Sequence, residues 1–324
     1  MKKALLIGLN DYVDLPLTCC NNDAEEFANL IETNDDGSPN FDVKIVTGSL
    51  TRNEMYTAIE QLFNDNAEIA LLYFSGHGSY KNSGYLCTTD INIQEIEQGV
   101  RMEDILRIAN ESNCKNKVII IDCCFAAKLG EISNFGNCSF LSNGLTIMAA
   151  CKEQQYSMEN REVGHGVFTN LLLEGLKGGA ADIAGNISPA RLYSYVDQSL
   201  GAWEQRPVFK TNTSRFVSLR TVTPKVHKYI IRKLPEYFKD STENFALDPS
   251  YEFTNTLECP HEIKEPFANS ENVKIFKELQ ILASAGLVEP FGAPHMYFAA
   301  MNSQACRLTK LGQHYWKLAK DKRF

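Results

Sequence analysis

The sequence lacks a long apolar run, and this absence argues against a membrane protein. No stretch approaches the roughly 18 consecutive apolar residues that a transmembrane helix needs. Residues 1–11 (MKKALLIGLND) place two lysines before an apolar run, as a secretory signal does. That run ends after six residues, however, and no small-residue cleavage site follows. We therefore predict a first strand there, and a cytoplasmic protein with no membrane partner.

Motifs for nucleotides, metals and disulfides are also missing. No G-x-x-x-x-G-K-[ST] loop occurs, and no G-x-G-x-x-G follows the first apolar segment, which disfavours a nucleotide-dependent main domain. The ten cysteines include two adjacent pairs but form no disulfide framework, so we expect reduced thiols. Cysteines and histidines show no zinc-ligand spacing. We expect neither a metal nor a cofactor.

Positive charge is scarce in the first two thirds of the chain. Residues 1–220 contain 18 basic and 28 acidic side chains, whereas the remaining residues contain 14 and 12. An acidic main domain argues against a nucleic-acid platform and is compatible with cationic substrates. The length of 324 residues suggests two domains, which we place at residues 1–218 and 219–324.

Strand-like and helix-like segments alternate up to about residue 215. The expected strands cover residues 3–10, 41–48, 68–78, 117–122, 145–150 and 206–211. The expected helices have apolar faces at Ala24, Phe27, Ala28 and Ile31, at Met55, Ile59 and Leu62, and at Met102, Ile105, Leu106 and Ala109; two more cover residues 164–176 and 188–200. This alternation predicts an α/β fold with a mostly parallel sheet flanked by helices.

The regular alternation of expected strands and helices ends before Thr221, and a different pattern follows. A helix with an apolar stripe is expected to end at Gly286, followed by two short strands at residues 295–302 (HMYFAAMN) and 305–309 (ACRLT). The stripe consists of Ile275, Phe276, Leu279, Leu282 and Ala283, and a closing helix is marked by Leu308, Leu311, Tyr315 and Leu318. Helix, strand pair and helix in this order predict a smaller winged-helix-like domain.

A buried strand ends in an unusual group of side chains. Residues 118–130 (VIIIDCCFAAKLG) pass from four β-branched residues to Asp122 and a cysteine pair. His77 stands 47 residues before Cys124, at the end of the preceding expected strand, between two glycines. Catalytic groups gather beyond the C-terminal ends of parallel strands. Because a thiol is only slightly ionised at neutral pH, a nucleophilic cysteine needs a histidine that takes its proton.

The blocks YFSGHGS (73–79) and IDCCFAA (121–127) resemble the two catalytic blocks of the caspase-like cysteine peptidases, family C14. The metacaspase and bacterial caspase-like branch, which commonly has an Asp-x-Cys motif, is the most similar. Further resembling blocks at residues 3–31, 165–178 and 205–211 extend the similarity over residues 3–212. At residues 125–127 the sequence has Phe-Ala-Ala where the family often has a polar residue followed by Ser-Gly, so we expect a differently shaped turn there.

The resemblance implies a cysteine endopeptidase with a caspase-like fold. Cys124 takes the place of the nucleophile and His77 that of the base, while Cys123 is expected to be packing. The backbone N–H groups of Gly78 and Cys124 would stabilise the oxyanion. His165, in a second Gly-His-Gly, is a rival for the base, although it fits better as a helix-start residue or a wall of the cleft.

The resemblance also suggests the specificity of the peptidase. Metacaspases have an acid at each of the positions of Asp23 and Asp122, and these acids line the site for P1, the substrate residue before the scissile bond. Ser75 is expected to join this substrate-binding set. Two carboxylates would pair with a cation, so we predict cleavage after Arg or Lys rather than after an acid. Alternatively, Asp23 is a first-turn carboxylate favoured by the helix dipole, and Asp122 accepts backbone hydrogen bonds at a strand end.

Two other functions stay open. The chain could be a catalytically silent scaffold or regulator that acts through its C-terminal module, or another hydrolase or transferase on the same dyad. Similar domain combinations suggest a bacterial defence or cell-death effector acting on protein substrates. Self-cleavage is expected within residues 128–144, after Lys128, or else after Arg161.

The C-terminal module is expected to control the peptidase by binding a small ligand or a protein partner. A winged helix that reads DNA places Lys and Arg on its second helix and wing. Residues 275–302 contain only one basic residue, Lys277, and the expected wing strands are apolar. An apolar strand pair would suit packing against another surface. A passive stabilising appendage is the alternative.

Overall fold

A computed structural model gives the structure of the chain and describes residues 1–64, 66–90, 99–129, 140–150, 159–160, 164–200, 206–258 and 262–323. The chain divides into two compact units, Met1–Thr223 and Pro224–Phe324. This division falls a few residues after the predicted boundary at residue 218. Within the described ranges, none of the helices combines the length and the apolar character required to cross a bilayer.

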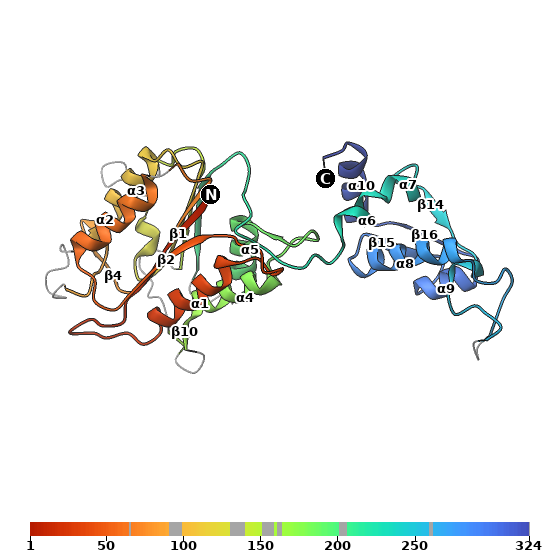
Figure 1. The fold of residues 1–324 in the computed structure, drawn as a ribbon, viewed down its shortest axis with the longest axis horizontal. Helices are drawn as coiled ribbons and strands as arrows, with labels where there is room; N and C mark the ends of the chain where they lie inside the picture. The colour runs from red at the N-terminus through yellow and green to blue at the C-terminus, as the bar shows by residue number, and fades with distance from the viewer. Residues whose placement is uncertain are drawn as a thin grey trace. The chain divides into compact units, whose positions relative to one another are not determined.

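The first unit is built on a six-stranded sheet with the strand order β12-β8-β7-β3-β1-β2. Figure 1 labels β1 and β2 of this sheet. Neighbouring strands are parallel, except that β12 runs antiparallel to β8. The strands are β1 (Lys2–Gly8), β2 (Asp42–Thr47), β3 (Ile69–Ser75), β7 (Asn116–Asp122), β8 (Leu145–Ala149) and β12 (Val208–Asn212). The mostly parallel α/β sheet predicted from the alternation of segments is confirmed.

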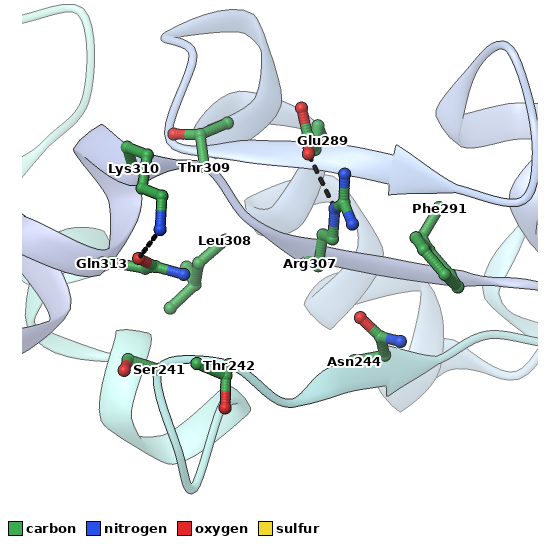
Figure 2. Close-up of a pocket in the computed structure, with 10 residues that line it drawn as sticks. All are labelled: Ser241, Thr242, Asn244, Glu289, Phe291, Arg307, Leu308, Thr309, Lys310 and Gln313. Carbon is green, nitrogen blue, oxygen red and sulfur yellow. Dashed lines mark hydrogen bonds and ion pairs between the residues drawn. The ribbon is translucent and has the colours of Figure 1, made fainter.

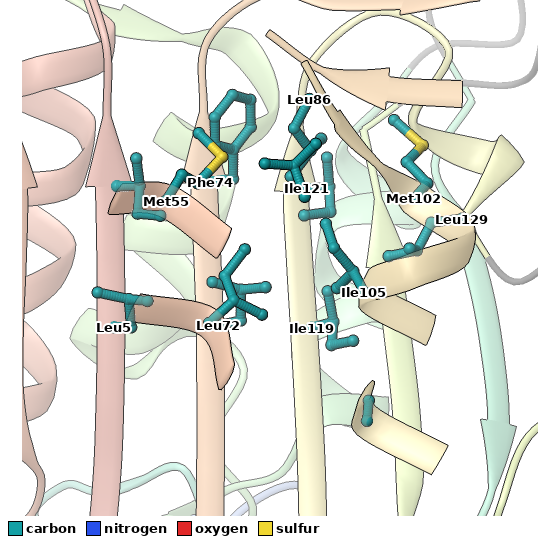
Figure 3. Packing of buried hydrophobic residues seen from close by; sticks show 14 of the residues in the cluster. Leu5, Met55, Leu72, Phe74, Leu86, Met102, Ile105, Ile119, Ile121 and Leu129 are labelled. Carbon is teal, nitrogen blue, oxygen red and sulfur yellow. The ribbon is translucent and has the colours of Figure 1, made fainter. Parts of the chain in front are cut away.

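Helices cover both faces of this sheet. Helices α2 (Arg52–Phe63) and α3 (Met102–Glu111) contribute to one apolar cluster, part of which Figure 3 shows. Helices α1 (Cys20–Glu32), α4 (Val167–Glu174) and α5 (Pro189–Ser199) contribute to a second cluster. The predicted apolar faces of α1, α2 and α3 are buried as expected. Because successive strand residues point to opposite faces, burial of both faces makes the central strands apolar throughout.

Short elements extend the edge where the central strands end. An antiparallel sheet consists of β4 (Gly78–Lys81), β5 (Ser83–Leu86) and β6 (Val100–Arg101). The remaining short elements of this unit are the 3₁₀ helix η2 (Ala126–Lys128), β9 (Glu159–Asn160), β10 (His165–Gly166), the π-helix η3 (Gly175–Gly179), β11 (Asn186–Ile187) and β13 (Arg220–Thr221). Strand β4 begins directly after His77, so the hairpin leads away from the predicted catalytic histidine.

The second unit has an antiparallel sheet with the order β14-β16-β15. Its elements are α6 (Lys228–Arg232), α7 (Leu234–Tyr237), β14 (Asn244–Ala246), the 3₁₀ helix η4 (Pro249–Tyr251), α8 (Ser270–Ser284), β15 (Val288–Phe291), α9 (Met296–Met301), β16 (Ala305–Leu308) and α10 (Lys310–Lys320). Its buried side chains include Phe238, Phe276 and Trp316, and the indole N–H of Trp316 donates to the carbonyl oxygen of Phe238 at 2.7 Å.

Two predictions for the second unit are wrong. The segment at residues 295–302 contains helix α9 instead of a strand, and Met296, Ala299, Ala300 and Met301 are buried in it. Strand β16 pairs with β14 on one side and on the other with β15, a segment to which the sequence interpretation assigned no element. The apolar residues around α9 are therefore largely core residues of this unit, and the expected apolar wing is absent from the described residues. The winged-helix-like description stays a prediction.

The closing helix α10 is present, but its buried face differs from the predicted one. Leu308 belongs to β16, and Leu311 is 45% exposed. Gly312, Tyr315 and Trp316 are the buried residues of α10. Glycine at position 312 allows a close approach, because a Cβ atom there would stand 1.9 Å from the carbonyl oxygen of Leu287.

Candidate functional site

The two central strands end side by side, and polar residues gather at this edge. Ser75, the last residue of β3, is paired in register with Asp122, the last residue of β7. Both residues are buried. The pairing extends one residue further, because the N–H of Gly76 donates to the carbonyl oxygen of Asp122 at 3.3 Å. His77 and Cys124 each follow two residues after the last register pair, so both leave the sheet at the same edge.

Tyr12 holds the loop that carries His77. The phenol oxygen accepts a hydrogen bond from the backbone N–H of His77 at 3.0 Å and donates to the carbonyl oxygen of Cys87 at 3.1 Å. The rings of Tyr12 and His77 are tilted by 60°, with their centroids 4.5 Å apart. Burial raises the pKa of Tyr12 well above its ordinary value, so the phenol keeps the proton that it donates.

The His77 ring is held in place by a main-chain atom. Its Nε2 lies 2.7 Å from the carbonyl oxygen of Leu15, in the loop between β1 and α1. A carbonyl oxygen can only accept, so Nε2 carries the hydrogen of this bond. In the neutral ring the other nitrogen, Nδ1, is then unprotonated and can accept a proton. Sequence reasoning missed Leu15, because no side-chain type marks a backbone acceptor.

Gly78 lies against the main chain of Cys124. A Cβ atom at Gly78 would stand 2.1 Å from the carbonyl oxygen of Cys124 and 2.6 Å from Sγ of Cys123. A larger residue at position 78 would therefore displace the backbone. The loops that carry His77 and Cys124 thus lie side by side at the sheet edge.

The two adjacent thiols have different surroundings. Cys123 is 1% exposed, and its Sγ donates to the carbonyl oxygen of Cys124 at 3.2 Å. Cys124 is half-buried, with its thiol not in a disulfide. Burial raises the pKa of a neighbouring thiol, Cys87, to about 11, so that thiol stays protonated. Of these three cysteines, Cys124 is the most exposed.

The turn after Cys124 has an uncommon backbone. Phe125 has φ 59° and ψ 14°, in the left-handed region that non-glycine residues seldom occupy. Such a residue typically costs about 1–3 kcal/mol. The Phe125 ring stacks on Tyr80, with the ring centroids 6.2 Å apart. This strained turn redirects the chain into η2 at the point where the sequence departs from the C14 pattern.

Asp23 and Asp122, which we call the acidic pair, meet at Gly166. A Cβ atom at Gly166 would stand 2.7 Å from Oδ2 of Asp122 and 3.3 Å from Oδ2 of Asp23. Asp122 is only 4% exposed and Asp23 only 1% exposed. Helix α1 and strand β7 thus bring both sequence-predicted acids to the same glycine.

Asp23 is hydrogen-bonded to three other residues. The hydroxyl of Ser75 donates to Oδ2 at 2.9 Å, and the N–H of Gly166 donates to Oδ1 at 3.2 Å. Nδ1 of His165 lies 2.9 Å from Oδ1. Burial, followed by repulsion from Asp122, raises the pKa of Asp23 to about 7 even though these bonds favour its charged form. Asp23 does lie in the first turn of α1, as the alternative interpretation expects, but it is also buried and hydrogen-bonded to Ser75, Gly166 and His165.

Asp122 is held by a chain of hydroxyl groups. The hydroxyl and the N–H of Thr169 donate to Oδ2 at 2.7 and 3.3 Å. The hydroxyl of Tyr73 lies 2.6 Å from Oγ1 of Thr169. Because Thr169 gives its hydrogen to Asp122, Tyr73 is the donor to Thr169. Sequence reasoning missed Tyr73 and Thr169, because their positions in a strand and a helix are those of ordinary core residues.

His165 lies among carboxylates. It belongs to β10, two residues before α4 begins, and is 6% exposed. Its Nδ1 faces Asp23, and its Nε2 lies 2.9 Å from Oε2 of Glu26. Both ring nitrogens are thus engaged, which leaves none to take a proton from a thiol. This contact set disfavours His165 as the rival base and makes it a neighbour of the acidic pair.

Other expectations concern segments at the margin of the described structure. Lys128 ends η2, whereas residues 130–139 of the expected self-cleavage segment and Arg161 lie outside the described residues. Among the residues that the structure does describe, no group of three or more His, Cys, Asp or Glu side chains could hold a metal ion.

The second unit has a hollow of about 580 Å³ on its sheet, shown in Figure 2. Residues of β14, β15, β16 and the start of α10 line it. The lining residues are Ser241, Thr242, Asn244, Glu289, Phe291, Arg307, Leu308, Thr309, Lys310 and Gln313. This volume is within the usual range for small-molecule sites, about 300–1,000 Å³.

Two cations face this hollow. Nε of Arg307 donates to Oε1 of Glu289 at 2.7 Å, and the guanidinium stacks 5.0 Å from the centre of the Phe291 ring. Within the described part of the chain, the terminal nitrogens of Arg307 make no hydrogen bond. Nζ of Lys310 lies 3.3 Å from Oε1 of Gln313. Glu289 orients the guanidinium and leaves its planar donor edge for a ligand.

Comparison with known proteins identifies the first unit. The family model described as the caspase domain matches residues 1–217. Among solved structures, the crystal structure of caspase-1 from Spodoptera frugiperda is similar, with a TM-score of 0.51 and 16% sequence identity. That similarity covers 68% of this chain and 90% of the other, and at this identity it shows the fold alone. None of the curated protein sequences matches. The predicted caspase-like fold is confirmed.

Proposed function

Because the chain belongs to the caspase-domain family of cysteine peptidases, we propose that it is a cysteine endopeptidase that cleaves proteins after Arg or Lys. His77 acts as the base, Cys124 as the nucleophile, and the acidic pair binds the P1 cation with Ser75. The observation that carries this proposal is the pair of buried carboxylates, Asp23 and Asp122, at the sheet edge that also carries His77 and Cys124. Paired carboxylates in a buried setting call for a cation.

The proposed reaction uses the tautomer of His77 that the Leu15 contact favours. Unprotonated Nδ1 takes the thiol proton of Cys124, and the thiolate forms a bond to the scissile carbonyl carbon. The oxyanion that results is stabilised by the N–H groups of Gly78 and Cys124. His77 then gives its proton to the leaving amine as the C–N bond breaks. Water, deprotonated by His77, hydrolyses the thioester and restores the thiol.

Cleavage after basic residues is expected in a peptide library that varies P1. The full chain should cut peptides with P1 Arg or Lys far faster than peptides with P1 Asp, because a like-charged P1 would stand against two carboxylates. Mass spectrometry of the products identifies the bond that is cut. Cys124→Ala, treated identically, is the blank for contaminating peptidases.

Two outcomes of the library would contradict the proposal. Cleavage mainly after Asp would show that the acidic pair does not bind P1. Cleavage of no peptide, with or without the candidate ligands named below, would instead support a silent scaffold. If the chain is active, the cleavage sites that it produces in a whole proteome would narrow the range of natural protein substrates. We propose a cytoplasmic setting for the protein, because such a setting keeps the thiol reduced.

We further propose that the hollow of the second unit binds a small oxyanion, a phosphate or carboxylate ligand, and that binding switches the peptidase on. The free donor edge of Arg307 matches such groups bidentately, and Lys310 adds a second positive charge. Phe291 offers an aromatic face to a planar part of the ligand. Ligand-switched proteolysis would suit the signal-activated defence or cell-death effector that the resemblance suggests.

Oxyanion binding is expected to raise the unfolding temperature of the full chain and to change its peptidase rate. The probes are inorganic phosphate, citrate and adenosine monophosphate, up to about 10 mM, where even a site with a millimolar Kd is filled. Ligand at 100 times its Kd stabilises a protein by about 2.7 kcal/mol. Arg307→Gln should remove both effects, because the bidentate donor edge is lost.

The matched control is Lys274→Gln, which removes an exposed cation from α8, away from the hollow. Its responses should equal those of the wild type. Equal responses in Arg307→Gln, or no response to any probe, would leave the second unit as a passive appendage. Salt-sensitive binding of duplex DNA by the full chain would overturn the assignment to a small ligand.

A further inference from the structure

His165 links the acidic pair to a second charged pair. Its Nδ1 lies 2.9 Å from Oδ1 of Asp23, and its Nε2 lies 2.9 Å from Oε2 of Glu26. The other oxygen of Glu26, Oε1, lies 2.9 Å from Nζ of Lys177 on η3. A buried imidazole thus stands between two carboxylates from the same helix, α1, of which only Asp23 belongs to the proposed substrate site.

The hydrogen bonds restrict where the protons can be. The hydrogen bond from Lys177 lowers the pKa of Glu26, so this carboxylate is ionised at neutral pH. An ionised carboxylate only accepts, so Nε2 of His165 carries a hydrogen. The contact with Asp23 then contains one proton, which resides on Nδ1 of His165 or on Oδ1 of Asp23. In the first case an imidazolium faces a carboxylate, and in the second a neutral ring faces a carboxylic acid.

The position of this proton decides whether both members of the acidic pair can be charged. With the proton on His165, Asp23 and Asp122 are both anions and the imidazolium offsets one of them. The net charge of the three groups is minus one wherever the proton resides, but only in this case do both carboxylates that would face an Arg or Lys side chain carry a negative charge. With the proton on Asp23, a neutral acid faces the substrate and the favourable interaction with a cation is weakened.

We propose that His165 is a positioning residue for substrate specificity, which holds the shared proton away from Asp23 so that both carboxylates of the acidic pair meet a P1 cation as anions. This inference rests on the proposed function, because it assigns a role at the same site. The charged and titratable groups around His165 are Asp23 and Glu26 from α1, Lys177 from η3 and Asp122 from β7, across Gly166.

The proposal is tested by comparing two peptide substrates that differ only in P1, arginine and citrulline. Citrulline has nearly the same shape as arginine but no charge. The ratio of the two kcat/KM values cancels the pH dependence of His77 and Cys124, which act on both substrates, and isolates the charge of the acidic pair. Burial raises the pKa of Asp23 to about 7, and the hydrogen bond with His165 keeps it from rising further, so in the wild type this ratio should rise with pH through about 7.

His165→Gln should lower this ratio and move its rise to higher pH. Glutamine can hydrogen-bond to Asp23 but cannot become a cation, so Asp23 retains its proton to higher pH. Each unit by which the midpoint rises lowers the arginine preference about 10-fold at pH values below the midpoint. The loss should fall on KM for the arginine substrate, with kcat for the citrulline substrate unchanged.

Two further variants complete the test, one as a second test of the role of His165 and one as a control. Glu26→Gln alters a side chain that is 35% exposed, so folding should be preserved. Glu26 is also outside the proposed P1 site. This substitution removes the carboxylate that stabilises a charged His165, so the shared proton should move toward Asp23 and the arginine preference below pH 7 should fall, by less than in His165→Gln. His227→Gln, at an exposed histidine of the second unit, should behave as the wild type.

The outcomes separate this inference from the proposed function. If the wild type cleaves after Arg but the arginine preference and its midpoint are the same in His165→Gln and Glu26→Gln, His165 has no positioning role and the inference is wrong. If His165→Gln does not fold, the arginine preference of Glu26→Gln decides alone. If the wild type shows no preference for arginine over citrulline at any pH, the proposed P1 specificity itself is wrong.

Discussion

Cys124→Ala is expected to abolish peptidase activity, whereas Cys123→Ala should keep most of it. The thiol of Cys124 is half-buried at the end of β7, while that of Cys123 is buried and bonded to the carbonyl oxygen of its neighbour. Removal of a nucleophile typically lowers kcat by about 10³-fold or more, which leaves only the contribution of binding and oxyanion stabilisation. The measurement is kcat on a fluorogenic peptide with P1 Arg, for the full chain and each variant.

His77→Ala should cause a loss of similar size, because the thiolate and its base act as a unit. The double variant His77→Ala/Cys124→Ala is then expected to be no slower than either single variant. Cys123→Ala serves as the matched control, since it removes an adjacent thiol of the same kind. An inactive Cys123→Ala beside an active Cys124→Ala would reverse our assignment of the thiols.

The second large effect is expected for Asp122→Asn. Asparagine can still accept the hydrogen bonds of Thr169, but it leaves the P1 cation with one carboxylate instead of two. Removal of one partner of a buried charge pair costs about 2–5 kcal/mol, or roughly 30-fold to several thousand-fold in kcat/KM for arginine substrates. The loss for the citrulline substrate should be small, because that substrate has no charge to pair.

Asp104→Asn is a suitable control, because this half-buried acid on α3 pairs with Arg107 at 3.8 Å on the outside of the sheet. Its kinetics should match the wild type for both substrates. Equal losses for arginine and citrulline in Asp122→Asn would mean that Asp122 supports the fold of the site and does not recognise charge.

The sequence was informative where residues act through their own side chains. A run of β-branched residues that ends in Asp122 and two cysteines predicts a buried strand with polar groups at its C-terminal end, and the register between β3 and β7 agrees with this. The buried faces of α1, α2 and α3 follow from the 3.6-residue period of their apolar residues. The structure then brings Asp23, Ser75 and Asp122 together at one sheet edge.

The contacts that sequence reasoning missed depend on tertiary proximity. Glu26 and Lys177 are separated by 151 positions, and nothing in either helix marks them as neighbours of His165. The error at α9, where a strand was predicted, has another cause. The segment Met296–Met301 is apolar but does not alternate, and alanine and methionine favour helices. Its composition therefore favoured a helix over the strand that was predicted.

The bond between His77 and Leu15 has a consequence for how this site can vary. The acceptor is a carbonyl oxygen, which every amino acid supplies, so this bond requires no particular side chain at position 15. Its direction depends on the backbone, and Pro16 disfavours helical torsion angles at the preceding residue. The tautomer of His77 with a hydrogen on Nε2 therefore depends on Pro16, beside the acceptor, and not on the side chain of Leu15.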